Sequence, residues 1–287
     1  TVYLEVQQMA QELLKGKAGS ICAMDIYTGE VIAMASSPTY DPNKFTHGIG
    51  HKDWGEIRDD PLKPLVNKSI AGLYSPGSTF KPLVALSALE FGTIDPEKPI
   101  LCKGHKHPYE LYGVKYHCWK KNGHGYMKLR NAIKQSCDIY FYEMARILGV
   151  DKLAIIAKRY GLGENILKDI YFDEKKGVVP DTFWKKNAIG KNWYLGETVI
   201  NGIGQGYIQT TPLQLCLMTA QIANGGYKIK PHIIHDQNIT YERVKLKIAN
   251  QYMNDLSIHT QDNQQSYLEE KEYQYYERLY KDPKNIN

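Results

Sequence analysis

Apolar positions near the start of the chain follow two different periods. Residues 3–15 carry apolar side chains at roughly helical spacing, which predicts an amphipathic helix that ends near Gly16. Residues 20–26 and 30–35 are short apolar runs on either side of a Tyr-Thr-Gly turn, a pattern typical of a β-hairpin. The chain is therefore expected to begin with a helix followed by two paired strands.

Irregular and helical segments alternate further along the chain. Residues 36–75 contain four prolines in a stretch of mixed polarity, which indicates irregular structure with at most short helices. Residues 78–91, 128–148 and 151–161 have helical patterns, and glycines supply stop signals after the second and third. Residues 212–222 are predicted to form another buried helix.

The composition changes at about residue 236. From there to residue 287 asparagine, glutamine, glutamate, lysine and tyrosine predominate, and seven of the 22 tyrosines lie in this part. Such a segment has few apolar positions from which to build a core. We expect residues 1–235 to form the folded domain, and residues 236–287 to form a polar, tyrosine-rich segment that is partly helical or mobile.

Charge and composition exclude several kinds of function. The 287 residues carry a net charge of +5, with lysines and arginines interspersed among acidic residues, so no nucleic-acid partner is indicated. The glycines at 202, 204 and 206 do not have the G-x-G-x-x-G spacing of a dinucleotide site. No run approaches the ~18 apolar residues of a membrane span, and a start at Thr1 rather than methionine suggests an interior start.

The most informative motif is a serine three residues before a lysine, Ser78 and Lys81, directly after a Pro-Gly turn. On a helix these two side chains share one face, so the hydroxyl and the amine can meet. A hydroxyl is a poor nucleophile at neutral pH and needs a neighbouring base, and a desolvated lysine at a helix N-terminus can be that base. The alternative is an ordinary helix start, with Ser78 as the cap and Lys81 solvated.

Three later motifs extend this pattern in a fixed order. Ser136-Cys137-Asp138 comes first, then Gly202-Ile203-Gly204-Gln205-Gly206-Tyr207, and then Thr210-Thr211-Pro212-Leu213-Gln214. From about residue 1 to about residue 235, the sequence resembles the transpeptidase domain of class B penicillin-binding proteins, most closely the cell-elongation type, penicillin-binding protein 2. The resemblance implies an α/β (α+β) fold of the penicillin-binding-protein and serine β-lactamase type. Its central antiparallel sheet, incomplete here, would be flanked by helices.

The resemblance also implies roles for four side chains. Ser78 would be acylated by a stem peptide ending in D-Ala-D-Ala, or covalently by a penicillin, and Lys81 would take the proton from Ser78. Ser136 would relay a proton to the departing amine. Asp138, where the family usually has Asn, would orient Lys81 or the donor amide. The alternative for Ser136 and Asp138 is helix capping, which both residue types favour.

A third motif of this family, Lys-Thr-Gly or Lys-Ser-Gly, occurs nowhere in the chain. In the family it lies on a strand that forms one wall of the cleft and contributes to the oxyanion hole. The chain ends where the motif would be expected, so it is interpreted as truncated before it and as impaired in D,D-transpeptidase activity. The alternatives are a non-catalytic remnant or interaction module and, less favoured, a class D-like β-lactamase.

The cysteines suggest a second chemistry. Cys102, Cys118 and Cys137, together with His124, make a set of three thiols and one imidazole, which suits a tetrahedral structural Zn²⁺. The spacing is not that of a short zinc finger. A Cys102–Cys118 disulfide in an oxidising compartment and three unrelated thiols remain alternatives.

The other soft side chains are less favoured as ligands. Cys22 and Cys216 lie in apolar segments and are predicted to be core residues. His105, His107 and His117 lie in polar sequence and are not the preferred ligands.

Partners and location follow from the resemblance alone. It implies peptidoglycan stem peptides and β-lactam antibiotics as reactants, and membrane proteins of the elongation complex as partners. It implies the periplasmic face of the bacterial inner membrane, with the family's membrane anchor and pedestal domain absent from this chain.

Overall fold

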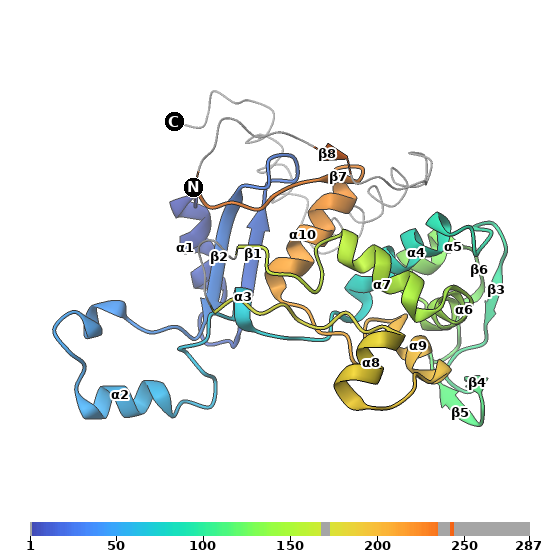
Figure 1. Ribbon diagram of the computed structural model, residues 1–287, viewed down its shortest axis with the longest axis horizontal. Coiled ribbons are helices and arrows are strands. Elements are labelled where there is room, and N and C mark those ends of the chain that lie inside the picture. The colour runs from blue at the N-terminus through green and yellow to red at the C-terminus, as the bar shows by residue number, and fades with distance from the viewer. Residues whose placement is uncertain (1, 168–172, 235–241, 244–287) are drawn as a thin grey trace.

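A computed structural model describes residues 2–167 and 173–234, and the backbone of 242–243 (Figure 1). The helices are α1 (Leu4–Leu13), α2 (His51–Arg58), α3 (Lys68–Ala71), α4 (Lys81–Glu90), α5 (Leu129–Lys134), α6 (Asp138–Leu148), α7 (Val150–Arg159), α8 (Thr182–Ile189), α9 (Leu195–Asn201) and α10 (Pro212–Ala223), with 3₁₀ turns η1 (Pro42–Phe45) and η2 (Gly77–Phe80). The strands are β1 (Gly19–Met24), β2 (Val31–Ser37), β3 (Ile100–Cys102), β4 (Tyr109–Leu111), β5 (Val114–Tyr116), β6 (Gly125–Met127), β7 (Tyr227–Lys228) and β8 (Glu242–Arg243).

The N-terminal elements form a sheet region. β1 and β2 pair antiparallel from Gly19–Ser37 onward, so the predicted hairpin and the helix before it are confirmed. α1 packs against β2, and α10 packs against β1 (Figure 1). The core between them is built from Met24, Val31, Ile70, Leu213, Leu217, Ala220 and Ile229.

A second, helical region contains α4 to α9 and the larger core (Figure 1). α4 packs against α6 and α7, and α6 also packs against α9. The buried side of α4 is mostly apolar, with Leu83, Val84 and Leu86 fully buried. This packing holds the N-termini of α4 and α6 together, and both ends carry residues of the predicted catalytic set.

Residues 36–75 are mostly irregular, as predicted. They leave the sheet region as a long excursion that carries α2 (Figure 1) and returns through the short helix α3. Trp54 of α2 contacts Phe45 with ring centroids 6.4 Å apart. No residue of α2 is buried, so this aromatic contact is part of what holds the excursion together.

The helix predicted over 128–148 is wrong in one respect, because it is broken between α5 and α6. Ser136 adopts a left-handed conformation with φ +49°. Its N–H donates to the carbonyl of Ile133, and the next N–H donates to the carbonyl of Ala132, the hydrogen bonds of a Schellman helix end. Glycine is the usual residue at that position, so a serine there costs about 1–2 kcal/mol.

The sheet pair flanked by helices agrees with the predicted fold class. The predicted tail at 236–287 lies outside the described residues, apart from the backbone of β8, which pairs with β7. Among the helices of the described part, none has the length and apolar character that crossing a membrane requires.

Candidate active site

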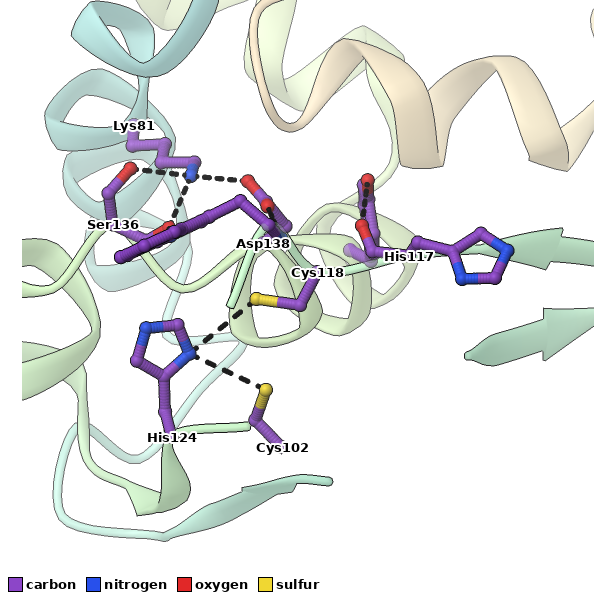
Figure 2. Close-up of polar contacts among 9 residues, drawn as sticks. Lys81, Cys102, His117, Cys118, His124, Ser136 and Asp138 are labelled. Carbon is purple, nitrogen blue, oxygen red and sulfur yellow. Dashed lines mark hydrogen bonds and ion pairs between the residues drawn. The ribbon is translucent and has the colours of Figure 1, made fainter. Parts of the chain in front are cut away.

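Lys81 is the centre of the site. It is the first residue of α4, and its side chain is 2% exposed. Its Nζ donates to Asp138 Oδ1 at 2.7 Å, to Ser136 Oγ at 2.9 Å and to the Ser136 carbonyl at 2.9 Å (Figure 2). All three donor positions of the ammonium group are therefore used, and the alternative of a solvated Lys81 is excluded.

Ser78 lies in the 3₁₀ turn η2 that leads directly into α4. The Lys81 N–H donates to the Ser78 carbonyl, and in a 3₁₀ turn the side chains of residues i and i+3 lie almost eclipsed. Ser78 is exposed, and in the part of the chain that the structure describes its hydroxyl makes no hydrogen bond. The nucleophile candidate is thus open to solvent, one 3₁₀ turn before the residue with the buried amine.

A glycine loop supports the turn that carries Ser78. The Gly77 N–H donates to the Gly204 carbonyl at 2.9 Å, and a Cβ on Gly204 would lie 2.2 Å from the Gly77 carbonyl oxygen. Gly204 also has a φ of +70°, so only glycine fits there. Tyr74 and Thr210 form an antiparallel bridge on the same side. The 202–206 motif thus has an architectural role, in supporting this turn.

Asp138 begins α6 and connects the site to the loop before it. Its Oδ1 accepts from Lys81, and its Oδ2 accepts from the backbone N–H of Trp119 at 3.0 Å. Both oxygens are engaged, so the carboxylate is fixed in direction. Neither Asp138 nor Ser136 caps α6 with its side chain, in contrast to the capping alternative.

Sequence reasoning missed Trp119 as a site residue. Its indole N–H donates to the Ser136 carbonyl at 3.0 Å, and its ring lies edge-on to His124 with centroids 5.4 Å apart. The signal available in the sequence was its position directly after Cys118, one of the candidate ligands.

The structure brings together the four candidate metal ligands. The sulfur atoms of Cys102, Cys118 and Cys137 and a ring nitrogen of His124 all lie within 4.8 Å of one another. His124 Nδ1 is 3.5 Å from the sulfurs of Cys102 and Cys118 (Figure 2). All five cysteines are free thiols.

The neighbouring histidines do not join this set. His105 and His117 stack on each other instead, with ring centroids 4.3 Å apart. Their ring nitrogens face backbone carbonyls rather than the sulfurs, since His105 Nδ1 lies 3.4 Å from the Cys118 carbonyl and His117 Nδ1 lies 2.9 Å from the His105 carbonyl.

Electrostatics favour a thiolate within this set. The hydrogen bond with Cys137 lowers the pKa of Cys118 to about 5, and the backbone N–H groups of Lys120 and Asp138 act in the same direction. The pKa of Cys137 is raised, first by that same hydrogen bond and then by burial. The thiolate is the form of cysteine that binds metals.

The sequence matches a known family over most of its length. The match to the penicillin binding protein transpeptidase domain covers residues 19–271. The chain is 39% identical over 230 residues to the peptidoglycan D,D-transpeptidase MrdA of Acinetobacter baumannii, which covers 80% of this chain and 34% of the relative. The chain therefore spans about a third of the length of that curated relative.

Two solved structures show the same fold. Penicillin-binding protein 2 of Pseudomonas aeruginosa, in complex with WCK 5153, has a TM-score of 0.81 at 39% identity, covering 89% of this chain and 59% of that one. Penicillin-binding protein 2 of Helicobacter pylori, in complex with MreC, has a TM-score of 0.81 at 32% identity, covering 89% and 47%. These likenesses confirm the predicted fold class.

Proposed function

This chain belongs to the penicillin-binding protein transpeptidase family, and from that membership we propose that it is the acylating part of a peptidoglycan D,D-transpeptidase. Its substrate would be a stem peptide that ends in D-Ala-D-Ala. The observation that carries the proposal is the buried amine of Lys81, in hydrogen-bond contact with both Ser136 and Asp138 and one 3₁₀ turn after Ser78.

The first half of the reaction forms an ester. The reacting form has a neutral Lys81 amine, with one proton fewer than the ammonium described above. In it, Ser78 Oγ attacks the carbonyl carbon between the two D-alanines, and the hydroxyl proton passes to that amine. Ser136 Oγ, 2.9 Å from Lys81 Nζ, then gives its proton to the departing D-alanine nitrogen and takes one from Lys81. Asp138 keeps the amine directed at Ser136 throughout, because both its oxygens are held.

The second half transfers the acyl group. The amine of another stem peptide attacks the ester carbonyl of Ser78 and loses a proton through Ser136 and Lys81. The bond between the acyl carbon and Ser78 Oγ breaks, and Oγ recovers its proton from Lys81. The product is a crosslink and the free enzyme. A penicillin enters the first half by opening its lactam ring on Ser78, and its leaving nitrogen stays attached.

Intact mass after incubation with a penicillin tests this function. A stoichiometric adduct that is absent in Ser78→Ala is expected, and its persistence over hours supports a transpeptidase. Release of the adduct with turnover of the drug would favour the class D-like β-lactamase. A folded chain with no adduct would favour the non-catalytic remnant and refute the proposal.

The proposed setting is the periplasmic face of the bacterial inner membrane, where stem peptides are crosslinked. The Helicobacter pylori relative was solved in complex with MreC, which supports membrane proteins of the elongation complex as partners of this chain. A pull-down with this chain as bait tests this partner. The MreC homologue of the organism that encodes the chain should be captured, and an unrelated periplasmic protein serves as the control.

We also propose that Cys102, Cys118, His124 and Cys137 bind a structural Zn²⁺. Bonds of ≈ 2.3 Å to sulfur and ≈ 2.0–2.1 Å to nitrogen at tetrahedral angles require S···N distances of roughly 3.5 Å. The two S···N distances are both 3.5 Å. His124 Nε2 is buried without a hydrogen-bond partner among the described residues, so Nδ1 is the nitrogen directed at the sulfurs.

The ion would link strands β3 and β6 to the start of α6, because Cys137 lies between Ser136 and Asp138. Metal analysis should find one zinc per chain, reduced in Cys102→Ser. Complete chelation should lower the melting temperature, because structural zinc contributes directly to folding. Cys22→Ser is the matched control, since Cys22 lies away from the set in β1. An unchanged melting curve after complete chelation would refute the proposal of a structural zinc.

A further inference from the structure

Trp119 contacts both partners of Lys81, Asp138 through its backbone and Ser136 through its side chain, and takes no part in the proposed chemistry. Its backbone N–H donates to Asp138 Oδ2 and its indole N–H to the Ser136 carbonyl, both at 3.0 Å. The Ser136 carbonyl also accepts from Lys81 Nζ. The Trp119 indole and the Lys81 amine thus hold the same backbone group from two sides.

Packing does not explain why this ring is held. Trp119 is 63% exposed, so its burial contributes little to stability compared with a core tryptophan. Its edge-on contact with His124 and its two hydrogen bonds are what fix it. The position of this exposed ring is therefore explained by its hydrogen bond to the Ser136 carbonyl, and not by packing in the hydrophobic core.

The held group is in a conformation that serine does not favour. Ser136 has a φ of +49°, in the left-handed region that L side chains adopt at a cost. This conformation ends α5 and directs Ser136 Oγ at Lys81 rather than at the N-terminus of α6. A tether on the Ser136 carbonyl opposes relaxation of that backbone.

We infer that Trp119 is a positioning residue that keeps Ser136 in the left-handed conformation in which its hydroxyl meets Lys81. The inference rests on the proposed function for its catalytic meaning, but the tether itself is a property of the fold. The relevant atom is the indole N–H, because the bond to Asp138 comes from the backbone and survives any side-chain substitution.

A stability comparison tests the tether without any activity. Trp119→Phe is made in two backgrounds, Ser136→Ala and Ser136→Gly, which both lack the hydroxyl but differ in the strain at positive φ. If Trp119 holds residue 136 at positive φ, loss of the indole lets an alanine at that position relax to a favoured conformation, which releases strain energy. A glycine there is not strained at positive φ, so it gains nothing from the same loss. The drop in melting temperature should therefore be smaller with alanine than with glycine. Equal drops would overturn the inference.

Acylation by penicillin then tests the positioning of the hydroxyl. Trp119→Phe, and Trp119 replaced by 3-benzothienylalanine, in which sulfur takes the place of the N–H, should each lower the rate constant of acylation roughly tenfold. The half-saturating penicillin concentration should change little. Trp54→Phe, in the distant α2 excursion, is the control and should leave the rate unchanged.

The two measurements separate the possible failures. A wild-type chain that acylates while the benzothienyl variant reacts at the wild-type rate would overturn the inference and leave the proposed function standing. A folded wild-type chain that does not acylate would refute the proposed function, and the stability comparison would still decide whether Trp119 holds Ser136.

Discussion

Lys81 and Lys185 are two lysines of the helical region with nearly the same burial and very different surroundings. Each side chain is 2% exposed and each pairs with a carboxylate, Asp138 for Lys81 and Glu197 for Lys185. Lys81 Nζ also contacts two oxygens of Ser136. Lys81 Nζ lies over one aromatic ring, that of Phe141, at 5.5 Å from its centroid. Lys185 Nζ lies over three, those of Trp193, Tyr194 and Tyr207, at 4.6–5.7 Å from their centroids.

The difference shows what makes a buried lysine reactive in this fold. The ammonium of Lys185 is surrounded by π faces, and its hydrogen-bond partner among the described residues is the carboxylate of Glu197. The ammonium of Lys81 touches a hydroxyl and lies one turn from another. Burial and an ion pair are thus common to both sites, and the neighbouring hydroxyls distinguish the proposed catalytic one.

The largest effect should come from exchanging each lysine for methionine. Lys81→Met should reduce penicillin acylation by about 10²- to 10⁴-fold, which is the usual contribution of a general base. Lys185→Met should leave the acylation rate of the folded fraction nearly unchanged and lower the melting temperature. Intact-mass kinetics and thermal unfolding of the same samples measure both.

The comparison would fail if Lys185→Met lost acylation as severely while it remained folded. Lys185 would then have to act on the site, through α9 and the glycine loop that supports Ser78. Lys134 is an exposed residue of α5, so Lys134→Met is a control for any nonspecific effect of removing a lysine.

A smaller effect is expected from breaking the Lys185–Glu197 pair on its acidic side. Glu197 also accepts from the N–H of Tyr194 at the start of α9, so the pair joins α8 to that helix. Glu197→Gln removes the negative charge that pairs with the buried ammonium, and should cost about 3 kcal/mol of unfolding free energy. Urea unfolding measures this cost.

The double variant sharpens that measurement. Replacing both Lys185 and Glu197 by leucine removes the charge together with its partner, and should restore most of the lost stability. A Glu197→Gln cost below about 1 kcal/mol, typical of an exposed pair, would contradict the view that the rings and the carboxylate form one closed environment for Lys185.

Much of the fold could be read from periodicity. The helix and hairpin at the N-terminus, the helix after Ser78 and α10 were predicted at nearly their observed bounds, because each has a regular apolar pattern and clear ends. The break at Ser136 could not be predicted, because a helical pattern continues through it and the chain has serine, not the usual glycine, at the left-handed helix end. The pairs β3–β6 and β4–β5 are three residues long, too short for a pattern.

The candidate site was predictable where a motif carries the chemistry. Lys81, Ser136 and Asp138 meet as the resemblance implied, and the cysteines with His124 gather although 35 residues separate the first from the last. The contacts of Trp119 and the ring enclosure of Lys185 were missed. Both depend on which side chains the loops place over a helix end, and neither has a spacing that the sequence reveals.

The Glu143–Arg146 pair of α6 is a more exposed reference for the two buried lysines, with side chains 25% and 38% exposed. Glu143 also accepts from the hydroxyl of Tyr109 at 2.6 Å. These bonds, first that from Arg146, lower the pKa of Glu143 below its ordinary value. Glu143→Gln should therefore cost less than about 1 kcal/mol at neutral pH.

The pH dependence decides whether that cost comes from the charge. A lowered pKa in the folded state means that the stabilisation is complete above the unfolded glutamate value of about 4.3, and that it is lost as the pH falls through the folded-state pKa. The difference between wild type and Glu143→Gln in unfolding free energy should shrink to zero in that acidic range. Glu110→Gln is the control for an exposed pair, since Glu110 and its partner Lys115 are both more than half exposed, and it should change the unfolding free energy little at neutral pH. If Glu143→Gln still lowers the unfolding free energy at acidic pH, the loss comes from hydrogen-bond geometry and not from the charge. The Glu143–Arg146 pair would then no longer serve as the exposed reference for Lys81 and Lys185.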